Sequence, residues 1–445
     1  MIVMSWDHSR DFLSNHAVSA RGSERWSGPL TDYDDNILVF LQRFVSHFCA
    51  PGFFFTMGFA MYMLSTSRAA KRGWGAGDII RHFIVRGFIL LVVGRLVDLA
   101  LAPLLIPIAV QNQTLFPKAG AGGANATSSS TPFRGPMWLA PLIGIWEVMT
   151  ALGFTMMLQG ILIPLLLAVE RRAARAGQWI SVGIGVLTIA ASTFLILRAQ
   201  NGDPCGPACE AHNNGNGTTT ITFPRFGAVA DGGLETFLRF SVYPGAFAFG
   251  DILYPVIPWI GVCQFGFAFG PLFKRNASQA FRVSGVVGCF CLVAFLVIRL
   301  WGGSGAGNLR GWPRGEGSRV DFIAFLTVSK YPPSVAYLLL TLGVDLSLLA
   351  VLKAWLGDGE NSKSEANSFA VHVLLVFGQV PLFFYTLHFW LLGCIGFCIR
   401  WFAVGLPIEF VTLPWLCMLV FLFYICRRYR AFKQGKRYDS WWKLI

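Results

Sequence analysis

Charged side chains are scarce in this sequence: only 13% of its 445 residues are Asp, Glu, Lys or Arg. In a soluble domain, charged residues normally make up about 25% of the sequence. Because 54% of the residues are hydrophobic, a soluble fold could not cover its surface with polar groups, and lipid must do part of the covering. The composition therefore excludes an ordinary soluble enzyme and predicts an integral membrane protein surrounded by membrane lipids.

Several signatures of function are also missing. The sequence has no nucleophile elbow, no glycine-rich loop that could cradle a phosphate, and no Cys/His spacing typical of zinc, so no metal is expected. No basic run is interleaved with aromatic residues in a polar segment, so the net charge of +13 does not indicate nucleic-acid binding. No strand pattern, repeat or soluble domain is visible, and we expect 1–445 to form one domain.

Apolar stretches that approach or exceed the 20 or so residues needed to cross a bilayer follow one another along the chain. The first run, 1–8, is too short, so we interpret it as the stub of a first helix that begins upstream of Met1. The run 370–398 contains Gly378 and Pro381, where we expect a kink or a re-entrant stretch. With the stub, the pattern predicts an all-α polytopic transmembrane helix bundle of about ten crossings. The other expected spans are 44–66, 83–107, 142–168, 178–197, 252–273, 281–300, 334–355 and 406–426.

Basic residues in short loops indicate the cytoplasmic side of a membrane protein. Four basic segments fall on one side of the expected bundle, which predicts a cytoplasmic C-terminus. These segments are 67–82, 169–177, 274–280 and the tail 427–445. The opposite side then carries three glycosylation-type triplets and two cysteines, for which a local disulfide and a free pair both remain open. They are Asn112, Asn125, Asn216, Cys205 and Cys209.

Ionisable groups at membrane depth are costly, so each is a candidate for function. Asp7 beside His8 could orient the imidazole and raise its basicity. The alternative is a hydrated helix end, since adjacent helical residues do not face each other. His47 could act as a general base toward a hydroxyl or an amine, and its alternative is a packing role at the interface.

Four residues on the outer side are candidates for substrate binding. Aromatic rings can stack on a sugar, and a lysine can hold an acidic group or a developing oxyanion. Their alternative is an aromatic belt with prolines that start helices. These residues are Tyr254, Trp259, Lys330 and Tyr331. His388 is a further candidate, with polar packing between helices as its alternative. Arg95 and Asp98, three residues apart, are expected to neutralise each other.

Six segments together resemble one family. In chain order they are MSWDHSRDF (4–12), RFVSHFCAPGFFF (43–55), WEVMTALG (146–153), YPVIPWIG (254–261), KYPPS (330–334) and FGQVPLFFYTLH (377–388). The set is similar to membrane proteins of the heparan-α-glucosaminide N-acetyltransferase-like group. This resemblance implies a multi-helix membrane acyltransferase that takes acetyl from cytoplasmic acetyl-CoA, or another acyl group from its acyl-CoA, and places it on a carbohydrate acceptor across the membrane.

The resemblance also implies an active histidine in the first outer loop. Residues 17–46 contain no histidine, so His8, His16 or His47 would fill that role. Our first choice for the general base is His47, with His8 and Asp7 as the alternative pair. The rival hypothesis is a non-enzymatic transporter or lipid-binding membrane protein, and the sequence leaves a homo-oligomer open.

We expect one cavity on the non-cytoplasmic side to collect the candidate residues. The acyl-CoA would approach from the basic side, toward Arg86 or Arg95. The residues expected to line the cavity are His47, His8, Trp259, Lys330 and Tyr331.

Overall fold

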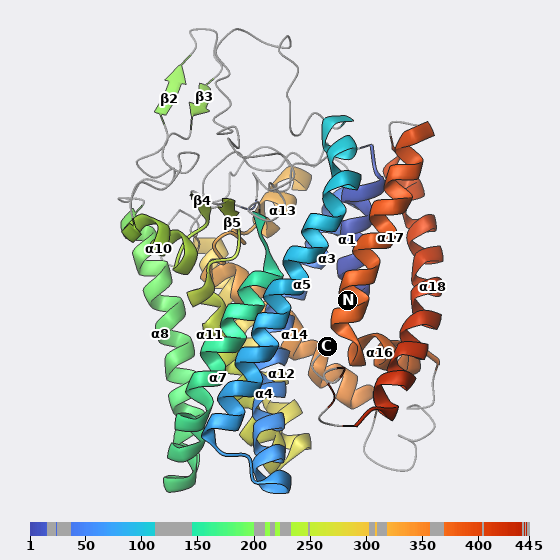
Figure 1. Cartoon of the computed structure of the whole chain (residues 1–445). Coiled ribbons are helices and arrows are strands. Elements are labelled where there is room, and N and C mark those ends of the chain that lie inside the picture. Colours follow the sequence, from blue (N-terminus) through green and yellow to red (C-terminus); the bar gives the residue numbers. More distant parts are fainter. Residues whose placement is uncertain are drawn as a thin grey trace.

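Long apolar helices form the body of the protein (Figure 1). The computed structural model describes residues 1–15, 24, 37–111, 145–199, 210–213, 219–222, 233–247, 250–301, 308, 318–356, 369–402, 405–437, 440 and 442. Among these residues, eight helical stretches are long and apolar enough to cross a membrane. Together with α1 (Ile2–Leu13) and α5 (Ala76–Gln111) they occupy every predicted span, so the all-α polytopic bundle is confirmed.

The other helices of the bundle follow one another in chain order. They are α3 (Ile37–Ser46), α4 (Cys49–Arg72), α7 (Val148–Arg172), α8 (Ala176–Ala199), α11 (Val256–Arg275), α12 (Ala277–Trp301), α14 (Val335–Leu356), α16 (Phe369–Gln379), α17 (Pro381–Phe402) and α18 (Ile408–Gly435). Two short helices, α10 (Gly233–Ser241) and α13 (Ser318–Leu326), lie at one end of the bundle.

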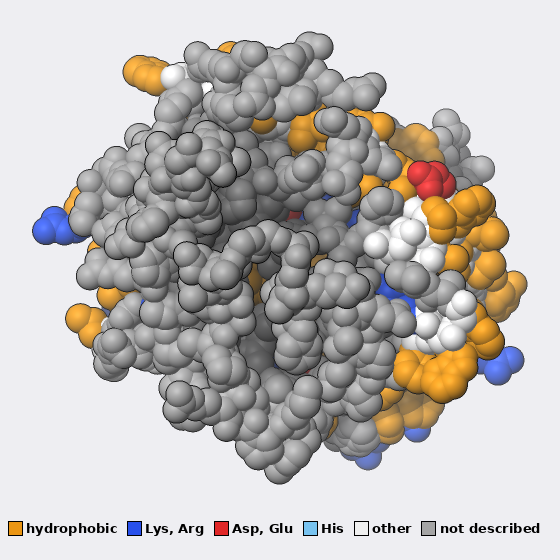
Figure 2. Space-filling model, turned by 90° about the horizontal axis from the view of Figure 1, so that it is seen from above, with side chains coloured by type: hydrophobic (Ala, Val, Ile, Leu, Met, Phe, Trp, Pro, Cys, Tyr) orange, Lys and Arg blue, Asp and Glu red, His pale blue; other side chains and the backbone are white. Residues whose placement is uncertain are grey.

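Burial separates a central helix from an outer layer. Within their apolar windows, 67% of α11 is buried but only 22% of α8, α12 and α18. Large apolar side chains on the outer helices are exposed, among them Leu187, Phe290 and Phe421. Seen from above, the described side chains at the rim are mostly hydrophobic (Figure 2). An outer layer of this kind suits contact with lipid.

Two glycines let α4 and α11 approach closely. A Cβ atom on Gly58 would lie 1.9 Å from the carbonyl oxygen of Cys263, and one on Gly266 would lie 1.8 Å from the carbonyl oxygen of Phe55. Small residues at such crossings allow backbone-to-backbone packing in membranes. This contact fixes α4, whose first turn follows His47, against α11, whose first turn carries Trp259.

Substituting Gly58 with alanine is expected to destabilise the protein by about 1–3 kcal/mol, because the added methyl meets backbone that cannot move aside cheaply. The control is Gly183→Ala in α8, where a Cβ atom would meet nothing within 4 Å. Thermal unfolding of both purified variants provides the measurement. Equal unfolding midpoints for the two variants would contradict the close crossing.

The break expected near Gly378 and Pro381 is present: the run 370–398 is divided into α16 and α17, and α17 begins at Pro381, where a missing N–H costs nothing. Two other features differ in detail from the sequence prediction. Helix α1 continues past the expected end at residue 8, because Arg10 pairs with Asp7 at 3.2 Å and with Asp11 at 2.9 Å, which neutralises charges expected to end the helix. Within the described residues five short strands also form, although no strand pattern was evident. They are β1 (Ile145–Trp146), β2 (Glu210–Asn213), β3 (Thr219–Thr222), β4 (Gly245–Phe247) and β5 (Gly250–Ile252).

The short strands lie at the same end of the bundle as α10 and α13 (Figure 1). Strand β5 pairs in parallel with β1 and antiparallel with β4, and β2 pairs antiparallel with β3. The β1–β5 pair joins the start of α7 to the segment that leads into α11. It therefore helps to position Tyr254, which follows β5 in the chain.

Candidate functional site

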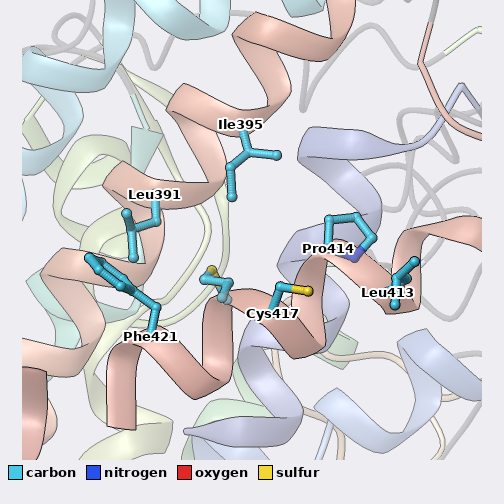
Figure 3. A pocket seen from close by; sticks show the side chains of 7 residues that line it. Leu391, Ile395, Leu413, Pro414, Cys417 and Phe421 are labelled. Atoms are coloured by element: carbon cyan, nitrogen blue, oxygen red, sulfur yellow. The ribbon is translucent and has the colours of Figure 1, made fainter. Parts of the chain in front are cut away.

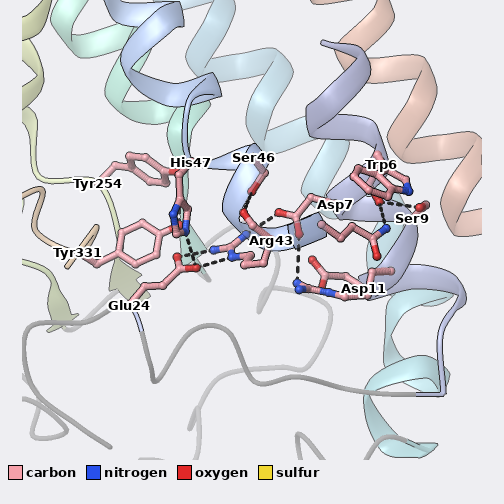
Figure 4. A network of polar contacts seen from close by, with 12 residues as sticks. Trp6, Asp7, Ser9, Asp11, Glu24, Arg43, Ser46, His47, Tyr254 and Tyr331 are labelled. Atoms are coloured by element: carbon pink, nitrogen blue, oxygen red, sulfur yellow. Dashed lines mark hydrogen bonds and ion pairs between the residues drawn. The ribbon is translucent and has the colours of Figure 1, made fainter. Parts of the chain in front are cut away.

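Glu24 belongs to a buried network of polar side chains in which Arg43 lies between Glu24 and Asp7 (Figure 4). Its carboxylate accepts two hydrogen bonds from the guanidinium of Arg43, and its Oε1 lies 2.8 Å from Nε2 of His47. Its carbonyl oxygen accepts the backbone N–H groups of Lys330 and Tyr331, at 2.9 and 3.0 Å. The side chain and the main chain of this one residue therefore join α3, the start of α4 and the segment before α14.

A chain of ion pairs extends this network into α1. Nη1 of Arg43 lies 2.6 Å from Oδ2 of Asp7, and Nη2 of Arg10 forms an ion pair with the other Asp7 oxygen at 3.2 Å. The side chains of Asp7 and Glu24 are only 3% and 1% exposed. Buried charges are tolerated when they are paired and hydrogen-bonded. We call the residues of this region the Glu24 cluster: Asp7, Arg10, Glu24, Arg43, His47, Lys330 and Tyr331.

The pairing fixes the protonation state of Glu24. Burial alone would raise the pKa of this carboxyl, but the charge of Arg43 and the contact with His47 hold the pKa well below its ordinary value. Glu24 is therefore a carboxylate at neutral pH. A carboxylate accepts hydrogen bonds only, so the proton between it and Nε2 belongs to His47.

Acid is expected to weaken the fold through Glu24. The folded-state pKa lies below the ordinary value of 4.5, so the stabilisation is complete above about pH 4.5 and declines as the pH falls toward the folded-state pKa. The unfolding midpoint of the wild type should therefore fall in acid more steeply than that of Glu24→Gln, which has no carboxylate at this position to protonate. Parallel acid profiles for the two proteins would contradict this prediction.

His47 has the arrangement of an oriented base. Its side chain is buried at the junction of α3 and α4, and Nε2 is held by Glu24. Its backbone carbonyl oxygen accepts the hydroxyl of Tyr337 at 2.8 Å, which anchors the residue to α14. Within the described residues, Nδ1 has no hydrogen-bond partner. Donation from Nε2 to Glu24 leaves the lone pair on Nδ1, so this atom can accept a proton.

Aromatic side chains and one cation stand beside His47. The hydroxyl groups of Tyr254 and Tyr331 are 3.3 Å apart, and their rings meet edge to face. Nζ of Lys330 lies 5.4 Å from the Tyr331 ring centroid, and the residue is only 4% exposed. Trp259 packs behind Tyr254 with 0% exposure and stacks on Phe54. Tyr254 therefore contacts the Glu24 cluster through Tyr331, and Trp259 supports Tyr254.

His8 and His388 form a separate group. Their ring centroids are 5.6 Å apart, and Phe389 packs against both. Nδ1 of His388 lies 3.0 Å from the carbonyl oxygen of Phe384 in its own helix. In the described part of the chain, no hydrogen bond or ring contact joins these two histidines to His47. Within the described residues, Glu24 connects His47 with Lys330 and Tyr331, whereas His8 packs against His388.

Among the described contacts, no hydrogen bond joins Asp7 to His8, the pairing that was one of the two interpretations of this segment. The carboxylate of Asp7 is directed to Arg43 and Arg10 instead. Neighbouring residues on a helix project in different directions, so Asp7 points toward α3 while His8 points toward α17.

Other sequence expectations have mixed outcomes. Arg95 and Asp98 do pair, at 2.9 Å, and Arg95 also bonds Thr150 of α7. No sequence pattern indicated Glu24 or Tyr337 as site residues, and Arg43 was evident only as part of the motif 43–55. The cysteines and the glycosylation-type asparagines lie outside the described residues: Cys205, Cys209, Asn112, Asn125 and Asn216.

An open groove of about 500 Å³ lies between α17 and α18 (Figure 3). Its lining is apolar throughout and includes Leu391, Ile395 and Phe421. The thiol of Cys417 is the one titratable group among the lining residues, and no described charged or imidazole side chain stands beside it there, so we assign the groove no part in chemistry. Among the described residues, no group of His, Cys, Asp and Glu is arranged to hold a metal ion.

Comparison with known proteins identifies no relative. The chain matches no protein-family model, no curated protein and no solved structure. The function must therefore be argued from the Glu24 cluster and from the sequence motifs.

Proposed function

We propose that this protein is a membrane acyltransferase that moves an acetyl or other acyl group from acyl-CoA to an amine or hydroxyl of a carbohydrate acceptor. The observation that carries the proposal is the His47–Glu24 pair, with Nε2 held at 2.8 Å and Nδ1 free of described partners. A base held by an orienting carboxylate is the arrangement that acyl transfer to a weak nucleophile requires. The motif resemblance supports the choice of acyl-CoA as donor.

His47 supplies the proton transfer in this mechanism. Its Nδ1 takes the proton of the acceptor as the acceptor nitrogen or oxygen attacks the thioester carbonyl carbon. Glu24 stabilises the imidazolium that results, because the carboxylate remains ionised. When the tetrahedral intermediate collapses, the carbon–sulfur bond breaks and His47 returns the proton to the leaving thiolate. The acyl group is then joined to the acceptor and His47 is neutral again.

Lys330 and the two tyrosines supply electrostatic stabilisation and binding. Within the described residues the ammonium of Lys330 has no carboxylate partner, so its charge can stabilise the oxyanion of the tetrahedral intermediate. Burial, reinforced by Tyr331, raises the pKa of the Tyr254 hydroxyl well above its ordinary value. This hydroxyl therefore stays protonated and can donate a hydrogen bond to a sugar, while the tyrosine rings offer apolar faces.

The concentration of basic residues at one end of the bundle supports an orientation of the protein in the membrane. The basic loops after α4, α7 and α11 lie at the end of the bundle opposite to the Glu24 cluster. If these loops are cytoplasmic, the acceptor reaches His47 from the non-cytoplasmic side and the C-terminus is in the cytoplasm.

One observation favours a proton-coupled transporter as the second candidate. Asp345 lies within the spanning helix α14, and its Oδ2 is buried with no partner among the described residues. It lies directly beside Gly52 of α4. An unpaired carboxyl at membrane depth is typical of proton relays in transporters.

A transfer assay tests the proposal. Radiolabelled acetyl-CoA is incubated with the purified protein and a panel of amino sugars and glycans. We expect label to move to a glycan amine or hydroxyl. Proteoliposomes loaded with the same glycans serve as the second arm. Glycan flux that follows a proton gradient, without any labelled product, would replace the acyltransferase proposal with the transporter.

A further inference from the structure

A second cluster of cationic and aromatic side chains lies where α4 turns into α5, at the end of the bundle opposite to Glu24. The guanidinium of Arg68 lies 5.5 Å from the Trp74 ring centroid, and the Trp74 and His82 rings are 5.1 Å apart. The charges of Arg86 and Arg68 both act on His82. We call these four residues the corner cluster: Arg68, Trp74, His82 and Arg86.

Arg86 is the unusual member of this cluster. It lies ten residues into α5, roughly 15 Å along the helix from Ala76. It is half-buried, and no described carboxylate or hydrogen-bond acceptor pairs with it. A cation at this depth is costly unless an anion compensates its charge.

His82 adds a second unsatisfied group on the same face of the helix. Residues four apart on a helix are neighbours, so His82 lies directly above Arg86. Its Nε2 is buried and has no hydrogen-bond partner among the described residues. The carboxylate of Asp78 accepts the backbone N–H of Gly75 at 3.0 Å, so it caps the turn. The His82 imidazole and the Arg86 guanidinium, both without described hydrogen-bond partners, therefore lie on the same face of α5.

Exposed apolar side chains lie beside this cluster. Val85 and Phe88, which flank Arg86 along α5, are 39% and 59% exposed. Trp74 occupies the turn between two helices, and tryptophan is enriched at the level of lipid head groups. An anion that reaches Arg86 can therefore come from the membrane as well as from water.

We propose that the corner cluster binds a phosphate ester, with Arg86 and His82 donating hydrogen bonds to its oxygens and Arg68 adding positive charge. Guanidinium groups bind phosphate oxygens with charge-assisted hydrogen bonds. The phosphate belongs either to the head group of an anionic phospholipid or to a phosphorylated soluble ligand such as coenzyme A. With a phospholipid as ligand this site is independent of the acyl-transfer proposal, because none of its residues belongs to the Glu24 cluster; with coenzyme A as ligand it rests on that proposal, since it would then hold the donor.

The test measures binding to the full-length protein in phosphatidylcholine nanodiscs. One arm titrates phosphatidylglycerol and the other titrates coenzyme A, whose free thiol carries no acyl group to transfer. We expect saturable binding in one arm, weakened about 10- to 100-fold by Arg86→Gln and restored in part by Arg86→Lys. The matched control is Arg81→Gln, an exposed arginine on the same helix.

The outcomes separate the alternatives. Loss of binding in Arg86→Gln but not in Arg81→Gln supports the site, and the arm that responds identifies the source of the phosphate. Equal affinity of Arg86→Gln and the wild type overturns the site, because Arg86 then only extends toward water. Equal losses in both variants overturn it as well, since they indicate attraction by overall charge. Where Arg86→Gln does not fold, His82→Gln is judged by the same criteria.

Discussion

Replacing His47 with glutamine is expected to lower acyl-transfer turnover by about 10²–10⁴-fold while the bundle stays folded. Glutamine retains an amide N–H that can still donate to Glu24, so the carboxylate keeps a partner. It cannot accept and return a proton, and this loss removes the base. The unfolding midpoint should therefore change little while the rate constant for turnover falls.

Two further variants decide whether the effect belongs to His47. His372→Gln alters another histidine of a membrane helix, in α16 against Phe423, and should leave turnover unchanged. His8→Gln tests the second histidine group. A loss of turnover in His8→Gln, with normal turnover in His47→Gln, would assign the general base to His8 or His388 instead of His47.

The positions of the membrane helices could be predicted because each depends on local composition alone. A run of about 20 apolar residues is sufficient to indicate a crossing, whatever its neighbours are. The same reasoning failed at α1, where Asp7 and Arg10 looked like the end of a helix. The charge of Asp7 is neutralised by Arg10 and by Arg43, which lies 36 residues from Asp7 in the chain, and Arg10 also pairs with Asp11. Pairing at that separation leaves no local signal.

The candidate site was predicted only in part for a related reason. His47, Lys330 and Tyr331 were found because their residue types are rare or recur near helix starts. Glu24 was missed because it stands alone in a polar stretch, and its contacts lie 19, 23 and about 300 residues away. Arg43 could have been predicted from the sequence, since it lies one helical turn before His47. A basic residue four positions from a candidate base at membrane depth requires a carboxylate, and searching for that carboxylate would have led to Glu24.

The second large effect is expected on stability, at Arg43. Replacing Arg43 with methionine should destabilise the protein by about 3–5 kcal/mol, because it leaves Asp7 and Glu24 as buried carboxylates without their shared cation. Methionine is apolar and flexible, so it fills much of the same space and little of the loss comes from a cavity. Chemical or thermal unfolding of the purified protein measures the change. Arg171→Met, at an exposed position in the last turn of α7, is the control and should alter stability by less than about 0.5 kcal/mol.

A compensating variant separates charge from packing at Arg43. Combining Arg43→Met with Asp7→Asn and Glu24→Gln removes the uncompensated charges, and buried ion pairs can often be replaced by neutral groups at little cost. The triple variant should therefore regain much of the lost stability, although its turnover should stay low because His47 has lost its carboxylate. If the triple variant is as unstable as Arg43→Met, the guanidinium contributes through packing and hydrogen bonds rather than through its charge. Full stability of Arg43→Met itself would show that the ion-pair chain does not hold α1, α3 and Glu24 together.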